Sequence, residues 1–306
     1  MTPTSPHDAP ELAGYLDEPK QLPSGSVGKN ALLRLGFERR DGRSILAFME
    51  RRAPLLVQRA LYCDEAMPGL PFVFIITNSG GILQGDRYTM EFRVGPGAAA
   101  HVTTQAATKI HEMDANYASQ VQEIVLEENA YLEYIPDQVI PFRHARFLTR
   151  SLVTVDPTAT LLYSEVLTGG RKYYREGELF QFDLFSSTVR AQRPDGPELF
   201  TEKFLIEPGR DDVRQTGVMG EFDVFGNVIL LTPKAHADRI FEQTPAVYDR
   251  VNRLAAGVSR LPNDAGLIYK VLGMEANVVR AKVREFWSVV RPEVVGFPVP
   301  KEFPWR

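Results

Sequence analysis

The sequence predicts a mainly β protein, with one large domain of many antiparallel strands in packed sheets and a few C-terminal helices. Short apolar or alternating runs recur from about residue 31 to 231, and clusters of Gly, Pro and Asp separate them. No alternation of strands with helices is apparent there, which argues against a parallel α/β fold. The length of 306 residues suits two modest domains or one large β-rich domain, and the unbroken strand pattern favours one.

The first 28 residues are expected to form a flexible arm, with the β domain over residues 29–306. Prolines and glycines punctuate this stretch, and few apolar residues are available to offset the entropy of ordering it. It could become ordered on a partner.

Strands are then predicted in order along the chain. Residues 72–76 are a continuous apolar run, long enough for a strand buried on both faces. Residues 87–94 alternate between apolar and polar side chains, which indicates one buried face. By the same criteria we expect strands at residues 122–126, 131–135, 147–155, 180–184 and 267–272.

Two helices are predicted near the C-terminus. Thr244 followed by Pro245 is a typical helix start, and apolar residues at helical spacing then continue to residue 258. Residues 279–290 read as an amphipathic helix, and we expect Pro292 to end it.

The composition excludes several classes of protein. A net charge of −4 argues against nucleic-acid binding through a basic surface. No run approaches about 18 apolar residues, so no membrane span is expected. The single cysteine, Cys63, cannot form an internal disulfide and no signal peptide is apparent, so we expect a cytoplasmic protein.

The common catalytic and metal motifs do not fit. Gly28-Lys29 lacks the loop and hydroxyl of a phosphate-binding motif, and His111-Glu112 lacks the second histidine of a zinc-protease helix. The five histidines are scattered, and a lone cysteine such as Cys63 is more often a small apolar filler than a nucleophile.

Three segments carry more polar and turn-forming residues than a β core requires: residues 78–86, 103–109 and 131–142. Each also has a purely structural explanation, as a hairpin connection, a polar strand edge or a solvated surface. Their notable residues are Gly80, Gly81, Gly85 and Asp86 in the first, Thr103, Thr104, Gln105, Thr108 and Lys109 in the second, and Glu133, Pro136, Asp137, Pro141 and Phe142 in the third.

In their order and spacing these segments resemble the signature of the urease accessory protein UreD family, called UreH in some organisms. The heptad at residues 103–109, which reads T-T-Q-A-A-T-K, is highly specific, and the resemblance covers roughly residues 30–305. Further matching stretches are residues 59–62, 95–98, 167–171, 177–180, 271–273 and 287–292. The departures are Ser79 for the usual proline, Gln84 in the glycine loop and Gln138 for a second proline.

The resemblance implies a largely β scaffold and chaperone that is not an enzyme. Such a protein would bind UreF directly, recruit the GTPase UreG through UreF, and dock as part of a hetero-oligomer on apo-urease for nickel insertion. It implies no membrane and no nucleic-acid partner.

The resemblance also implies no permanently held cofactor, with Ni²⁺ bound only in transit. Imidazole and thiolate sets bind Ni²⁺ tightly, and this chain has one cysteine and no histidine cluster. Carboxylates bind more weakly, so Glu133, Asp137 and Glu178 are the expected transient ligands, and Asp86 is a further candidate. The threonine and glutamine side chains of residues 103–105 are expected to line a wet path. The other motif residues are expected to serve transit or an interface.

Two alternatives of other classes stay open at this point. Glu133 and Asp137 could be the acid and base of a hydrolase or isomerase, which predicts a pocket that holds both carboxylates. A β-rich ligand-binding module predicts an aromatic-lined cleft and no partner. A scaffold instead predicts poor solubility of the isolated chain, because its partner surface is exposed.

Overall fold

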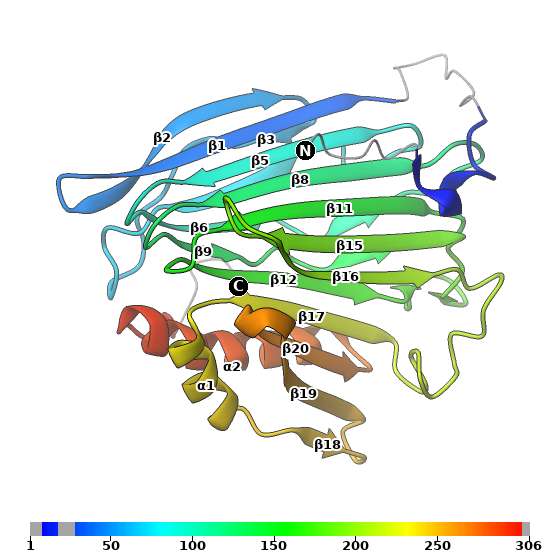
Figure 1. Ribbon diagram of the computed structural model, residues 1–306. Helices are drawn as coiled ribbons and strands as arrows, with labels where there is room; N and C mark the ends of the chain where they lie inside the picture. Colours follow the sequence, from blue (N-terminus) through cyan, green and yellow to red (C-terminus); the bar gives the residue numbers. More distant parts are fainter. Residues whose placement is uncertain (1–7, 18–27, 302–306) are drawn as a thin grey trace.

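Two large β-sheets lie face to face and form most of the molecule (Figure 1). The computed structural model describes residues 8–17 and 28–301. One sheet has seven strands in the order β16-β15-β11-β8-β5-β1-β2. Their bounds are β1 Asn30–Arg40, β2 Arg43–Arg52, β5 Arg87–Val94, β8 Ala118–Leu126, β11 Arg146–Val155, β15 Leu184–Gln192 and β16 Glu198–Ile206.

The second sheet has eleven strands, with a main path in the order β18-β19-β20-β17-β12-β9-β6-β4-β3. Two short strands, β10 (Val139–Pro141) and β7 (Thr108–Ile110), extend it beside β12, and β13 (Gly170–Arg171) pairs with β14 (Glu178–Leu179) separately. The remaining bounds are β3 Leu55–Leu56, β4 Phe72–Thr77, β6 Ala99–Thr104, β9 Tyr131–Tyr134, β12 Thr160–Thr168, β17 Val224–Leu231, β18 Val247–Asp249, β19 Leu254–Arg260 and β20 Gly266–Gly273.

The mainly β, single-domain prediction is confirmed, but the sheets are mixed and not antiparallel as expected. From β4 to β12 the long strands alternate between the two sheets, so each sheet receives every second strand in the same direction. The pairs β5–β8, β8–β11, β6–β9 and β9–β12 are therefore parallel, while β1–β2, β15–β16 and β17–β20 are antiparallel. Alternating side chains report a buried face and carry no information on strand direction, which explains the error.

Apolar side chains fill both faces of the eleven-stranded sheet. Its inner face packs against the seven-stranded sheet through residues such as Leu132, Tyr163 and Phe92. Its outer face packs against α1 (Lys234–Glu242) and α2 (Ala276–Val295), which lie below it in Figure 1. A strand such as β12, buried on both faces, accordingly reads as an apolar run without clean alternation.

The strand predictions for residues 72–76, 87–94, 122–126, 131–135, 147–155 and 267–272 are confirmed within one or two residues or as parts of longer strands. The prediction for residues 180–184 is wrong. Phe180 has a φ of 55°, in the left-handed region, and strand β15 begins only at Leu184. The alternation of Phe180 and Phe182 thus belongs to a turn that happens to bury apolar side chains.

The helix expected over residues 244–258 is also wrong. Thr244 lies just after α1, which ends at Glu242, and its hydroxyl donates to the carbonyl of Ile240 at 2.7 Å. The following residues form β18 and β19, and β19 buries Leu254 and Ala256 while it pairs with β20. This sheet pairing outweighs the helical spacing of the apolar residues.

The helix predicted over residues 279–290 is confirmed within α2. Pro292 does not end it, and α2 continues to Val295, where Gly296 adopts a left-handed φ of 78°. A proline so close to the end interrupts only the last turn, and its carbonyl still accepts the amide of Gly296.

Part of the expected N-terminal arm packs on the seven-stranded sheet. Residues 8–17 contain a short 3₁₀ turn in which Leu12 is buried against Tyr117, Leu148 and Leu184. The Glu11 carboxylate accepts a hydrogen bond from Ser186 at 2.7 Å. Residues 1–7 and 18–27 of the expected arm lie outside the described residues. Across the part of the chain that the structure describes, no helix is long and apolar enough to cross a membrane.

Candidate functional site

A cavity of about 60 Å³ lies between the two sheets, with both apolar and polar side chains in its wall, and we call it the inter-sheet cavity. Two of the motif segments contribute Thr104, Thr108 and Asp137 to its wall. A space of this volume suits a few water molecules. The strands add further polar side chains, namely Thr77, Tyr88, Gln120, Gln122, Tyr134, Thr149, Tyr163 and Glu165.

Glu165 on β12 and Asp137 are the two carboxylates that line this cavity. The Glu165 Oε1 accepts a hydrogen bond from the Ser187 hydroxyl at 2.9 Å, whereas its Oε2 is buried without a hydrogen-bond partner among the described residues. Burial raises the pKa of Glu165 to about 7, although the hydroxyls of Ser187 and Tyr163 favour its ionised form. The group therefore changes charge near neutral pH.

A second set of polar groups fixes the middle of the cavity wall. Gln122 donates to the Tyr134 hydroxyl at 2.7 Å and accepts from the Ser151 hydroxyl at 2.8 Å. Tyr163 donates to the same Gln122 oxygen at 3.3 Å. These bonds link the seven-stranded sheet to the eleven-stranded sheet through polar side chains inside an otherwise apolar core.

Asp86 organises the glycine loop and does not reach a ligand position. It is fully buried, and its two oxygens accept the backbone amides of Lys29 and Leu83, each at 2.9 Å. The loop thereby joins the start of β1 to the start of β5. This is the structural explanation of residues 78–86, in which Gly80 and Gly85 both take a positive φ of 76°.

Glycine is required at position 81 because neighbouring atoms approach its Cα closely. We therefore predict that alanine is more destabilising at Gly81 than at Gly80. An alanine Cβ at Gly81 would lie 2.7 Å from the His111 ring and from the Lys109 carbonyl, whereas at Gly80 nothing lies within 4 Å. Both residues have positive φ, so Gly81→Ala should lower the free energy of unfolding by about 1–3 kcal/mol more than Gly80→Ala does. Denaturant unfolding of the two variants measures the difference, and equal values would contradict the clash.

The heptad at residues 103–109 is divided among different surroundings. Thr104 and Thr108 line the inter-sheet cavity, and Thr104 also accepts the amide of Asp137 at 2.9 Å. Thr103 points to the other side of the sheet, where its hydroxyl donates to the Ile135 carbonyl at 2.7 Å. Gln105 and Lys109 are exposed.

Glu133 lies in a closed cluster on the outer face of the eleven-stranded sheet. It is fully buried, its Oε2 lies 2.8 Å from His101 Nδ1, and its Oε1 accepts from Tyr131 and from Trp287 at 2.6 Å each. Arg291, also fully buried, lies 3.2 Å away through Nε. Burial alone would raise the pKa of Glu133, but these donors and the Arg291 charge hold it below its ordinary value.

Asp137 and Glu178 are likewise paired with cations. Asp137 accepts the amide of Gln138 at 2.9 Å and lies 3.3 Å from Arg280. Glu178 forms two bonds with Arg171, at 2.6 and 2.7 Å. Within residues 8–17 and 28–301, no group of three His, Cys, Asp or Glu residues is placed to hold a metal ion. The three predicted transient ligands are therefore not assembled into one site.

The prolines of the third segment and Phe142 shape the surroundings. Pro136 lines the inter-sheet cavity, and Pro141 is buried at the end of β10. The Phe142 ring lies under the guanidinium of Arg171 at 3.9 Å and thus supports the Arg171–Glu178 pair.

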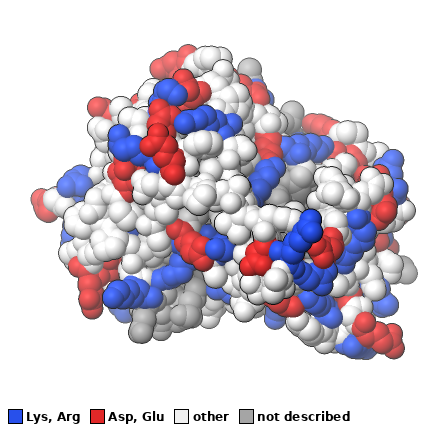
Figure 2. Space-filling view, turned by 90° about the horizontal axis from the view of Figure 1, so that it is seen from below, with Lys and Arg blue, Asp and Glu red and all other residues white. Residues whose placement is uncertain are grey.

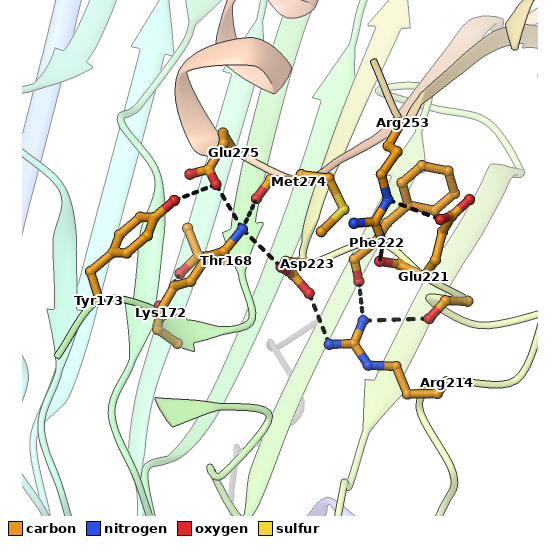
Figure 3. A network of polar contacts seen from close by, with 12 residues as sticks. Thr168, Lys172, Tyr173, Arg214, Glu221, Phe222, Asp223, Arg253, Met274 and Glu275 are labelled. Carbon is orange, nitrogen blue, oxygen red and sulfur yellow. Dashed lines mark hydrogen bonds and ion pairs between the residues drawn. The ribbon is translucent and has the colours of Figure 1, made fainter. Parts of the chain in front are cut away.

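A further polar network, not anticipated from the sequence, ties three loops to the start of α2 (Figure 3). The buried carboxylate of Asp223 lies 3.0 Å from Lys172 and accepts from Arg214 at 2.8 Å. Lys172 also donates to Glu275 at 2.7 Å and to the carbonyl of Met274 at 2.9 Å. These residues have no sequence spacing that would have revealed the network.

Sequence reasoning also missed Glu165, Gln122, Thr149 and Tyr163, the polar residues that distinguish the inter-sheet cavity. They stand in ordinary strand patterns, and only the facing of the two sheets brings them together. A charged residue inside an apolar strand run, such as Glu165 among its neighbours, was the one available signal.

Comparisons with known proteins agree along nearly the whole chain. The family model described as UreD urease accessory protein matches residues 29–306. The chain is 61% identical over 297 residues to "Urease accessory protein UreD 2" of Brucella suis biovar 1 (strain 1330), which covers 97% of this chain and 98% of that protein. It is 54% identical over 299 residues to "Urease accessory protein UreD" of Yersinia pseudotuberculosis serotype O:1b (strain IP 31758). The matched region covers 98% of this chain and 93% of that protein.

Proposed function

The chain belongs to the UreD family of urease accessory proteins, and from this premise we propose that it is a scaffold and chaperone for nickel insertion into apo-urease. The observation that carries the proposal is the match over residues 29–306, together with identities of 54–61% to curated relatives. The resemblance identified from residues 78–86, 103–109 and 131–142 is thereby confirmed.

The proposed partners are UreF directly, UreG through UreF, and apo-urease, in a cytoplasmic hetero-oligomer. Large apolar side chains on the surface support a role in assembly: Tyr248 in β18 is 63% exposed, Val251 on the turn after β18 is 91% exposed, and Tyr173 is 79% exposed. The lower face of the molecule, as it is oriented in Figure 1, carries both basic and acidic side chains among broad uncharged areas (Figure 2). Such a mixed surface favours a protein partner over a polyanion.

We propose that Ni²⁺ is cargo, and that the inter-sheet cavity forms part of its route. The polar atoms of the cavity are hydroxyl, amide and carboxylate oxygens from Thr104, Thr108, Gln122 and Glu165, with Asp137 at its edge. Oxygen ligands bind Ni²⁺ less tightly than imidazole or thiolate, which suits passage and not storage. Glu165 replaces Glu133 as the favoured transient ligand, because every oxygen of Glu133 already has a partner.

The same contacts disfavour the alternative of an acid–base hydrolase or isomerase. Glu133 is fully buried and bound by His101, Tyr131 and Trp287, and Asp137 pairs with Arg280, so neither carboxyl is free to exchange a proton with a substrate.

Urease activation in cells tests the proposal. In cells that carry the urease genes but lack this chain, we expect urease protein without activity, and restored activity when the chain is supplied. A parallel pull-down with tagged UreF should recover the chain in stoichiometric amount. Full urease activity without the chain, at ordinary nickel concentration, would contradict the accessory role, and recovery of urease activity without UreF capture would contradict the proposed assembly alone.

A further inference from the structure

A second and larger pocket lies between α2 and the outer face of the eleven-stranded sheet, and we call it the helix–sheet pocket. Its volume is about 360 Å³, at the lower end of the range for small-molecule sites. The sheet side contributes Thr103, Ile135, Ser164 and Val166, and the helix contributes Arg280, Arg284 and neighbouring residues. It shares Pro136 and Val166 with the wall of the inter-sheet cavity, and its other lining residues differ from those of that cavity.

The charged residues that line this pocket are all cationic. Arg280 and Arg284 stand one turn apart on α2, and Lys301 follows at the mouth. No carboxylate is among the lining residues; Asp137 lies 3.3 Å from Arg280 and offsets part of its charge. Burial lowers the pKa of Arg284, and its guanidinium is held in place by the carbonyls of Pro300 and Lys301.

An unsatisfied polar group lies on the sheet side of the pocket. Ser164 on β12 is fully buried, and its hydroxyl has no hydrogen-bond partner among the described residues. A buried hydroxyl without a partner is costly, so its presence in a ligand-sized pocket indicates a polar atom that it meets there. This observation is independent of the charges of α2.

The remaining walls are apolar. Ile135 and Val166 from the sheet face Val283 and Trp287 from α2. Trp287 has its indole N–H directed to Glu133, so its ring presents carbon surface to the pocket. These apolar walls cannot replace the water shell of a strongly hydrated ion such as inorganic phosphate.

We propose that the helix–sheet pocket binds a small organic carboxylate with an apolar body. The guanidinium of Arg280, assisted by Arg284, receives the carboxylate, because a planar guanidinium pairs well with that group. The apolar body lies against Val166, Val283 and Trp287, and Ser164 hydrogen-bonds a polar atom of the ligand at the sheet. This inference concerns the outer face of the sheet and does not depend on the proposed role in urease maturation.

Titration calorimetry of the purified full-length chain tests the site with three probes. The probes are 3-phenylpropanoate, its neutral amide 3-phenylpropanamide, and inorganic phosphate. We expect the carboxylate to bind with a dissociation constant of about 1 mM or lower, and the amide and phosphate at least about tenfold more weakly. Equal binding of carboxylate and amide, or no binding of the carboxylate, would overturn the proposal.

Variants place the binding in the pocket. Arg280→Gln should weaken 3-phenylpropanoate binding about tenfold, and Ser164→Ala by about threefold to fivefold. Lys282→Gln is the matched control, because Lys282 is on the same helix outside the pocket and pairs with Glu285 as Arg280 pairs with Asp137. An equal loss of 3-phenylpropanoate affinity in Arg280→Gln and Lys282→Gln would show that only the net charge of the protein matters, and it would overturn the proposed site.

Two further measurements guard against indirect effects. Thermal unfolding of each variant should show a melting temperature close to that of the parent chain, so that a loss of binding is not a loss of fold. A chain that ends at Lys301 should bind the carboxylate as tightly as the full chain or more tightly. Loss of binding in this shortened chain would assign the site to residues 302–306 and overturn the proposal.

Discussion

Replacing Glu133 with alanine is expected to lower the free energy of unfolding by about 3–5 kcal/mol. Glu133 neutralises the fully buried Arg291, and its oxygens accept bonds from Tyr131 and Trp287. Arg291 also donates to Asp64 at 2.5 Å. The variant would therefore leave the buried guanidinium with Asp64 as a carboxylate partner but without Glu133. Because Trp287 and Arg291 belong to α2, the variant should loosen α2 from the sheet.

Chemical denaturation with fluorescence detection measures this loss, since Trp287 reports directly on the cluster. Asp137→Ala is the matched control: Asp137 comes from the same segment, but its partner Arg280 is one-third exposed and water can replace the contact. We expect a smaller loss, of about 1 kcal/mol, in the control, because this ion pair is partly exposed, with Arg280 33% and Asp137 13% exposed. A small effect of Glu133→Ala together with intact α2 packing would show that the cluster does not anchor the helix.

This expectation changes how loss of urease activation is interpreted. A Glu133→Ala variant that fails to activate urease would not demonstrate nickel handling, because the fold itself is weakened. Asp137→Ala isolates the question better, since Asp137 lines the inter-sheet cavity and its replacement is expected to cost less stability than that of Glu133. Lower activation in Asp137→Ala with unchanged UreF capture would support a route through the cavity.

The positions of the strands were predictable because alternation and apolar runs are local signals. The directions of the strands were not, because a chain that alternates between two sheets leaves the same local pattern as a meander. The helix expected over residues 244–258 failed for a related reason: β19 gains a partner in β20 that no local pattern displays. Tertiary pairing decided both cases.

The site residues show the same division. Asp86 and Gly81 were found from local motifs, although only the Asp86–Leu83 contact is local, and Lys29, Lys109 and His111 come from other segments. The sequence marked Glu133 as an unusual carboxylate among aromatic residues. Its partners His101, Trp287 and Arg291 lie up to 158 residues away along the chain, so the sequence could not show that Glu133 holds α2 against the sheet. Glu165 was not found, because its meaning depends on a cavity that exists only when the sheets face each other.

Replacing Glu165 with glutamine should make the protein more stable at pH 8 and less able to activate urease. In the unfolded chain a glutamate has a pKa of about 4.3, whereas burial raises the pKa of Glu165 to about 7 in the folded protein. Below pH 4.3 both states are protonated; between about pH 4.3 and 7 only the unfolded state ionises, so parent stability falls as pH rises. The stability advantage of Glu165→Gln should therefore grow across this window and reach about 3–4 kcal/mol.

Denaturant unfolding at pH 5 and pH 8 measures the stability, and urease activation in cells measures the function. Glu178→Gln is the control, because the Arg171 partner holds the pKa of Glu178 below its ordinary value against the effect of burial, so this variant should gain no stability at pH 8. Near neutral pH a substantial fraction of Glu165 is ionised, as the proposed weak binding of Ni²⁺ requires, and glutamine lacks that charge. Greater stability with unchanged activation would remove Glu165 from the nickel route, whereas greater stability with reduced activation would show that the buried carboxylate is kept for function at the expense of the fold.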